Sequence, residues 1–149
     1  MKLKELLYTH CMNYVLDRIS RIKLEIKKAQ SSANEETKSS AGDKYETGRA
    51  MAQLEIEKNT KQLTEAEKLL GMLNNILAEN TSSVIIPGSL ILTDKGVFYI
   101  AISIGQVTID QNNYFIIAPD SPIGKIFIGK KNGDIVEWNK ITYSIKSIE

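Results

Sequence analysis

The sequence has few residues of the types that build disulfides, zinc sites and nucleophilic dyads. Among 149 residues there is one cysteine and one histidine. A single cysteine cannot form a disulfide within the chain, and two such ligands are too few for a zinc site. His10 and Cys11 are neighbours, and on a helix they would point about 100° apart, which excludes a working pair. We therefore expect Cys11 to be a small apolar residue near a helix seam.

Strong net charge and long apolar runs are also missing. The formal net charge is +1, so there is no global basic field for non-specific nucleic-acid binding. The longest apolar run, near residues 83–92, is broken by Pro87 and Gly88 and is too short to span a membrane. Residues 1–5 begin an amphipathic helix rather than a signal peptide. These absences predict a cytoplasmic protein without membrane association or independent DNA binding.

Proline is confined to the second half, and this asymmetry divides the chain near residues 80–83. Before that point, apolar residues recur at helical spacing without any proline. After it come β-branched runs separated by the turn signals 94–96, 111–113 and 131–134. We predict a helical domain over residues 1–79 and a β domain over residues 80–149.

The first half carries two apolar seams with alternating steps of four and three residues, as in a coiled coil. The first seam is Tyr8, Met12, Val15, Ile19, Ile22, Ile26, Ala29 and Ala33, and the second is Ala52, Ile56, Asn59, Leu63, Ala66, Leu70, Leu73 and Leu77. They register as antiparallel layers centred on Ser39, which predicts a hairpin with its tip near residues 34–46. Helical arms of about 30 residues would extend roughly 45 Å. A homodimeric coiled coil is the alternative, and Asn59 would fix the register of either structure.

The second half predicts a small antiparallel sheet with one short helix. Residues 89–92 and 97–102 flank a turn as in a β-hairpin, and residues 114–118 form an apolar strand. Ser121 is a helix N-cap, Pro122 occupies the first turn, and Gly129 ends that helix. In a last strand from Ile141 onward, apolar and polar residues alternate. The fold class is therefore α+β, with an antiparallel coiled-coil hairpin followed by the β domain.

Two acidic residues lie where the predicted hairpin turns, in the segment Gly42-Asp43-Lys44-Tyr45-Glu46. At a spacing of three on a helix, Asp43 and Glu46 lie close together, and carboxylates are hard ligands suited to Mg²⁺. The same spacing describes a capping box, in which Asp43 is the N-cap and Glu46 the third helical residue. The residues alone leave both interpretations open.

The segment 121–134 opens a helix with Ser-Pro, closes it with Gly-Lys and continues into a turn containing Gly-Asp. In this it resembles the signature helix of the bacterial Gre transcript-cleavage factors. That family has the same order of an antiparallel coiled coil and an FKBP-like β domain. Its hairpin tip carries Gly-Asp-x-x-Glu, which Gly42, Asp43 and Glu46 match.

The resemblance implies a role in transcription elongation. Gre factors bind RNA polymerase through the globular domain and insert the coiled coil into its secondary channel. On this resemblance Asp43 and Glu46 would help the polymerase hold its second Mg²⁺ and orient the water that hydrolyses backtracked RNA. The free protein would bind no cofactor, have no independent enzymatic activity and meet nascent RNA only indirectly. The polymerase-binding residues would be Ser121, Pro122, Lys125, Lys130 and Lys131.

The tip also departs from the family pattern. Gre tips usually continue from the glutamate with Asn, another acid and Tyr, where this chain has Thr47-Gly48-Arg49. Lys44 and Arg49 would compete with a metal for the acids. Two alternatives follow: a channel-binding regulator that does not cleave RNA, and a coiled-coil adaptor with an unrelated partner. Trp138, as the sole tryptophan, does not favour the aromatic pocket that a prolyl isomerase needs.

Overall fold

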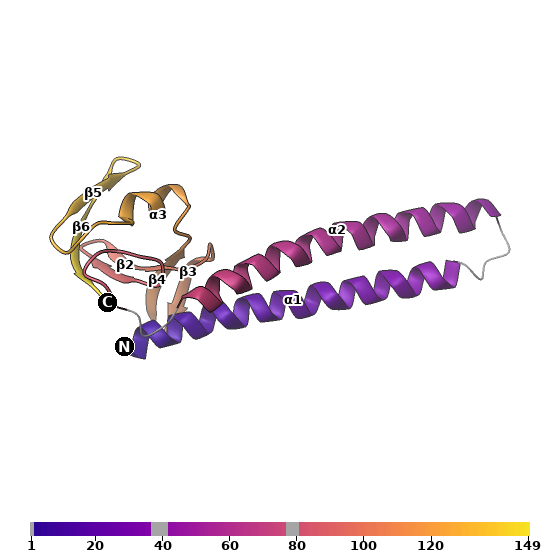
Figure 1. Cartoon of the computed structure of the whole chain (residues 1–149), viewed down its shortest axis with the longest axis horizontal. Helices are drawn as coiled ribbons and strands as arrows, with labels where there is room; N and C mark the ends of the chain where they lie inside the picture. Colours follow the sequence, from indigo (N-terminus) through magenta and orange to yellow (C-terminus); the bar gives the residue numbers. More distant parts are fainter. Residues whose placement is uncertain (1, 37–41, 77–80) are drawn as a thin grey trace. The chain divides into compact units, whose positions relative to one another are not determined.

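The computed structural model describes residues 2–36, 42–76 and 81–149. Two long helices come first, α1 (Lys2–Glu36) and α2 (Gly42–Asn75), and they run side by side as a hairpin (Figure 1). The later elements are β1 (Leu90–Thr93), β2 (Gly96–Ile100), β3 (Gly105–Ile109), β4 (Asn112–Ile117), α3 (Pro122–Phe127), β5 (Ile135–Trp138) and β6 (Ile141–Ile148). The predicted α+β class is confirmed. The hairpin tip was predicted near residues 34–46, and residues 37–41 of that range lie outside the described residues.

By packing, the chain divides into two compact units. The hairpin unit comprises Tyr14–Leu70, and the sheet unit comprises Met1–Asn13 together with Gly71–Glu149. The base of each long helix thus belongs to the same unit as the β-sheet. The boundary predicted at residue 79 follows the change from helix to strand, and it stays a prediction.

In the hairpin unit, the predicted seams are the buried faces of the two helices. Val15, Ile19, Ile22, Ala29, Ala52, Asn59 and Ala66 are buried. Ile26, Ile56 and Leu63 are half-buried at the intervening positions. Apolar residues away from the seams, such as Leu24 and Leu54, are exposed. The coiled-coil periodicity therefore identified the buried faces, while the individual cross-helix pairings stay predictions.

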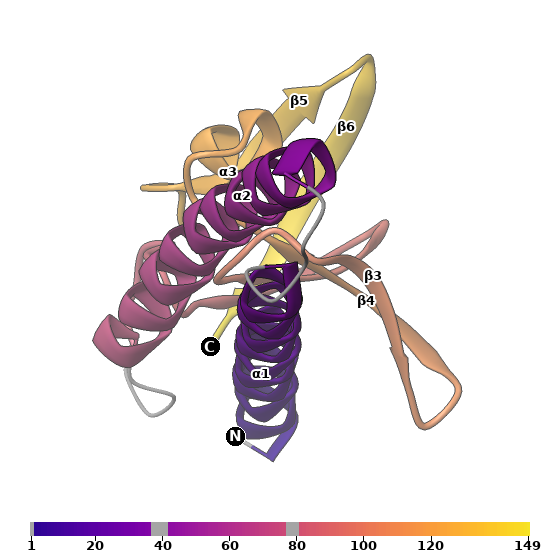
Figure 2. The ribbon, with the colours of Figure 1, turned by 90° about the vertical axis from the view of Figure 1, so that its right-hand side faces the viewer.

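The sheet unit contains a six-stranded sheet in the order β3-β4-β2-β1-β6-β5. The predicted hairpin is confirmed as β1 and β2, paired from Leu90 with Tyr99 to Thr93 with Gly96. Two further hairpins, β3–β4 and β5–β6, are visible in Figure 2. The pairing of β2 with β4 is parallel, so the sheet is mostly rather than wholly antiparallel.

The short turns of these two hairpins use left-handed backbone at residues other than glycine. Asp110 and Gln111 have φ of 51° and 69°, and Asn139 and Lys140 have φ of 52° and 65°. Two consecutive residues with positive φ are typical of the two-residue turns that match the twist of paired strands. The β3–β4 turn therefore lies just before the asparagines expected to form it.

One face of the sheet carries the apolar core with α3 against it. Its buried members are Ile85, Ile91, Phe98, Ile100, Phe127, Val136, Tyr143 and Ile145. Phe98 is central, with ring centroids 5.2 Å from Phe115, 5.1 Å from Phe127 and 5.6 Å from Tyr143. The first pair is stacked, the second tilted and the third edge-on, and such aromatic pairs add to the free energy gained from burial alone.

The opposite side of β2 carries Tyr99, which is fully buried. Burial, reinforced by the nearby Cys11 and Tyr8, raises the pKa of the Tyr99 hydroxyl. Tyr8 donates a hydrogen bond from its hydroxyl to the Leu73 carbonyl at 2.9 Å, which joins the bases of α1 and α2. Cys11 is buried, as predicted, and burial raises the pKa of its thiol to about 12.

The shifted thiol makes stability depend on alkaline pH. An unfolded cysteine ionises near its ordinary pKa of 9.0, whereas the folded thiol does not ionise until about 12. The contribution of Cys11 is therefore complete below pH 9.0 and is lost as pH rises toward 12. We expect urea unfolding to show a loss of stability between pH 8 and pH 10 that is smaller by about 1 kcal/mol in Cys11→Ala. Equal losses in the two proteins would contradict a buried thiol.

Candidate functional site

The acidic pair lies at the start of α2. This helix begins at Gly42, so Asp43 lies in its first turn and Glu46 in its second. Residues three apart on a helix share a face, as the sequence predicted. Glu46 is exposed. The Asp43 side chain lies outside what the structure describes, so the separation of the two carboxylates stays a prediction.

Arg49 lies on the same helix face as Glu46. Both residues line a shallow pocket with Ala50 and Gln53. A cation one turn from a carboxylate attracts it and competes with any metal for its oxygens. Arg49 is therefore placed where it could compete with a metal ion for Glu46, as the sequence predicted. The Lys44 side chain lies outside the described residues.

The described residues contain no cluster of metal-binding side chains. Within residues 2–36, 42–76 and 81–149, no three His, Cys, Asp or Glu side chains gather as ligands for a metal ion. The metal-assisting role of Asp43 and Glu46 stays a prediction.

The Ser-Pro motif builds the start of α3. Ser121 is the N-cap: its hydroxyl accepts a hydrogen bond from the Gly124 N–H at 3.1 Å and donates one to the Ala118 carbonyl at 2.7 Å. Pro122 occupies the first turn, where a missing N–H costs nothing. Gly129 follows the helix with a φ of 83°, which confirms the predicted end. The Ser121 hydroxyl is thus engaged within the fold, whereas Pro122 is exposed.

Gly124 is required by a close approach of two backbone segments. A Cβ atom at this position would lie 2.0 Å from the Ala118 carbonyl oxygen and 2.9 Å from the Ser121 hydroxyl oxygen. No side chain fits at such separations unless the backbone moves. Glycine is therefore needed at position 124 because no larger side chain has room there.

The three lysines predicted to bind polymerase are all exposed: Lys125 on α3, and Lys130 and Lys131 in the turn after it. The Lys131 N–H donates to the Asp134 carboxylate at 2.9 Å, so Asp134 stabilises the turn that presents these cations. The turn also contains Gly133, with a φ of 93°. The Lys131 backbone N–H thus stabilises the turn, and the side chains of the three lysines are exposed.

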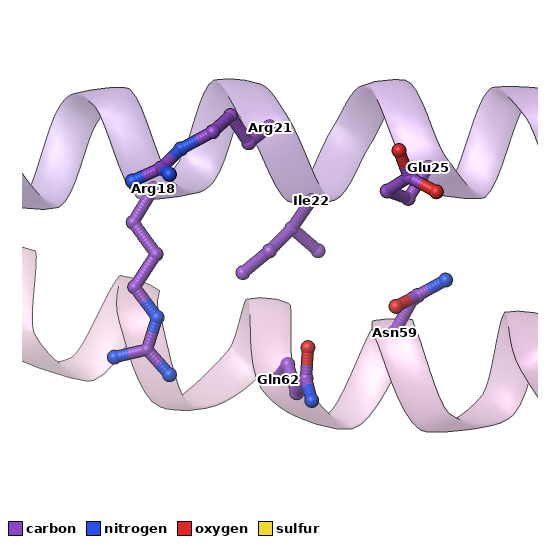
Figure 3. A pocket seen from close by; sticks show the side chains of 6 residues that line it. All are labelled: Arg18, Arg21, Ile22, Glu25, Asn59 and Gln62. Carbon is purple, nitrogen blue, oxygen red and sulfur yellow. The ribbon is translucent and has the colours of Figure 1, made fainter.

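A second polar site, between α1 and α2, was not predicted (Figure 3). A cavity of about 290 Å³ is lined by Arg18, Arg21, Ile22, Glu25, Asn59 and Gln62. Figure 3 shows the Arg18 side chain reaching from α1 toward α2. Arg21 pairs with Asp17 at 3.0 Å on its own helix.

Asn59 shows how this cavity relates to the seam. It is buried, as a seam residue should be, and its amide donates to Glu55 Oε1 on the same helix at 3.5 Å. A role in fixing the register between the helices stays a prediction. The cavity was missed because its cations occupy helix positions next to the seam, where the sequence pattern indicates only solvation.

Comparison with known protein families finds none that matches this chain, and no curated protein matches it either. No helix in the described part of the chain combines the length and apolar character needed to cross a membrane.

The steric role of Gly124 predicts opposite effects for two substitutions of helical glycines. Gly124→Ala should lower the free energy of unfolding by about 2 kcal/mol or more, because the new methyl group overlaps the Ala118 carbonyl. At Gly71 in α2, a Cβ would meet no atom of the described residues within 4 Å beyond its own stretch of helix. Gly71→Ala should therefore raise the free energy of unfolding by up to about 1 kcal/mol. Urea unfolding monitored through Trp138 fluorescence measures both. Similar effects of the two substitutions would show that Gly124 is not sterically constrained.

Proposed function

We propose that this protein is a transcription elongation factor that enters the secondary channel of RNA polymerase and stimulates cleavage of backtracked RNA. The observation that carries the proposal is the position of the acids. Asp43 and Glu46 lie in the first two turns of α2, immediately after the turn of a long helical hairpin. The resemblance of residues 121–134 to the Gre signature supports the same assignment.

The helices are suited to reaching into a narrow channel. α1 has 35 residues and α2 has 34, so each is roughly 50 Å long at the usual rise per residue. The outer positions of the hairpin unit are largely polar, and the buried seam supports the pair along its length. A two-helix arm is among the thinnest protein structures that can present a fixed pair of side chains.

The chemistry of the tip fits assistance rather than independent catalysis. Asp43 and Glu46 would supply carboxylate oxygens, which are preferred ligands of Mg²⁺, to a metal that the polymerase also binds. Such a Mg²⁺ would position a water and stabilise the charge that develops on the phosphate. The N-terminal end of a helix favours nearby negative charge, which suits carboxylates at this position. The complete site would contain residues of both proteins.

One observation favours a second candidate, a channel-binding regulator that does not cleave RNA. Arg49 lines the same pocket as Glu46, where a cation competes with Mg²⁺ for the carboxylate. In this alternative the hairpin changes access to the channel, and the acids act as helix-start residues. An adaptor with an unrelated partner is the third candidate, and it predicts no competition with a known ligand of the channel.

The acid pair can be tested without changing side-chain volume. In a backtracked elongation complex of the cognate polymerase with Mg²⁺, the protein should shorten nascent RNA and release short 3′ fragments. Asp43→Asn with Glu46→Gln should keep polymerase affinity and reduce the cleavage rate by about 100-fold or more, because the metal loses two charged ligands. Arg49→Gln should keep or increase the rate, since it removes the competing cation.

The outcomes separate the three candidates. Undiminished cleavage by the doubly substituted protein would contradict the roles of Asp43 and Glu46. Binding without any cleavage by the unmodified protein would favour the regulator. Failure to compete with a known channel ligand would favour the adaptor.

The lysines near α3 give a separate prediction about binding. Substituting Lys125, Lys130 and Lys131 by Gln should weaken polymerase binding at least about tenfold at low salt, and the difference should shrink as salt screens the charges. Lys146→Gln, at an exposed position of β6, is the matched control and should leave the affinity unchanged. Equal affinities for the triple variant and the unmodified protein would remove these lysines from the interface.

A further inference from the structure

The turn between α3 and β5 contains Asn132, which is the one asparagine in the sequence that glycine follows. An asparagine before glycine loses its side-chain amide more readily than any other, because no Cβ atom shields the nitrogen of the glycine. Asn132 and Gly133 are both exposed, so water and base can reach them. Whether this asparagine reacts therefore depends on how the fold holds the backbone at Gly133.

The reaction has two steps that set its geometric requirements. The backbone nitrogen of Gly133 gives up its proton and attacks the side-chain carbonyl carbon of Asn132, and a cyclic succinimide forms as ammonia leaves. Water then adds to one of the two ring carbonyls, which gives aspartate or isoaspartate at position 132. The first step needs a Gly133 nitrogen that can lose its proton and turn toward the Asn132 side chain.

The native hydrogen bonds hold the Gly133 nitrogen away from this reaction. The Gly133 N–H donates to the Ile145 carbonyl at 2.9 Å, and the Ile145 N–H donates to the Asp134 carbonyl at 2.9 Å. Ile145 lies in β6 and is 1% exposed, so this anchor is part of the core. The Gly133 N–H is therefore directed toward β6, and its proton is held by an acceptor.

The turn is also closed by bonds between its own ends. The Asp134 N–H donates to the Lys131 carbonyl at 3.0 Å, and the Asp134 carboxylate accepts from the Lys131 N–H at 2.9 Å. Gly133 has a φ of 93°, and the other residues with positive φ do not include Asn132, which is the pattern of a type II turn. Because both ends are fixed, the Gly133 nitrogen can reach the Asn132 side chain only after the turn separates from β6.

We infer that Asn132 is a site of spontaneous deamidation whose rate is controlled by opening of this turn. Isoaspartate adds a methylene group to the backbone, so the turn closed between Lys131 and Asp134 no longer has its native length. Either product adds a negative charge next to the exposed Lys130 and Lys131. The modification thus converts a transient opening into a lasting change of a cationic surface. The inference does not depend on a role in transcription.

The full-length unmodified protein provides the first test. It is incubated at mildly alkaline pH with and without denaturing guanidinium chloride and then digested with trypsin, which releases residues 132–140 with both Asn132 and Asn139. Fragment masses measure deamidation at each asparagine, and a sample taken before incubation corrects for deamidation during digestion. Asn132 should react at least about tenfold more slowly in the folded protein than in denaturant, because the open turn is a minor population. Equal rates would overturn the inference, as would a rate at Asn132 in denaturant no higher than that at Asn139.

Two carboxylates at and near the start of β5 supply a matched pair of variants. Asp134→Ala removes the acceptor of the Lys131 N–H, whereas Glu137→Ala removes an exposed carboxylate of β5. In the folded protein, Asp134→Ala should speed deamidation of Asn132 at least about threefold, and Glu137→Ala should leave it unchanged. Urea unfolding verifies that both variants are folded, and deuterium exchange of the Gly133 N–H should accelerate in Asp134→Ala alone. Equal deamidation rates in the two variants would show that this turn does not control the reaction and would overturn the inference.

Discussion

The sheet unit depends on the burial of both faces of β2. Phe98 and Ile100 enter the core under α3, and Tyr99 between them is buried on the opposite side, where Cys11 and Tyr8 lie nearby. The Tyr99 hydroxyl has no hydrogen-bond partner within the described residues, at a cost of about 1–3 kcal/mol. Burial of its ring contributes about 4 kcal/mol or more, so the apolar term outweighs the lost hydrogen bond. This balance explains how a polar group can lie in the interior of a stable sheet.

Local patterns predicted the elements that local physics determines. Steps of three and four residues identified both long helices, because one apolar stripe suffices to define a helix face. Ser121 and Pro122 predicted the start of α3, since capping acts within one turn. The strands β3 and β5 were not predicted individually. Each has just one buried residue, Val107 in β3 and Val136 in β5, and both strands lie at edges of the sheet. The parallel pairing of β2 with β4 also has no local signal, because tertiary packing determines it.

The acid pair at the start of α2 and the aromatic pocket of the sheet unit also differ in how far local sequence reveals them. Asp43 and Glu46 are three residues apart on one helix, so the sequence alone was enough to identify them as a pair. By contrast, a pocket of the sheet unit is lined by aromatic rings from four separate strands: Phe98 from β2, Phe115 from β4, Trp138 from β5 and Tyr143 from β6. Each ring alone looks like an ordinary core residue. A concave surface arises only when the sheet brings them together, which no spacing rule in the sequence expresses.

The resemblance over residues 121–134 has a physical explanation that limits what it implies about function. Ser121 caps α3, Gly124 avoids the Ala118 carbonyl, and Asp134 stabilises the following turn. Any chain with this helix and turn would need similar residues, whatever its partner. These residues therefore serve the local fold of the segment, and a fold does not determine a function. The case for a polymerase partner has to come from residues that the fold does not require. The lysines around α3 and the acids meet that condition, because the lysines are exposed and the acids lie in the first two turns of α2.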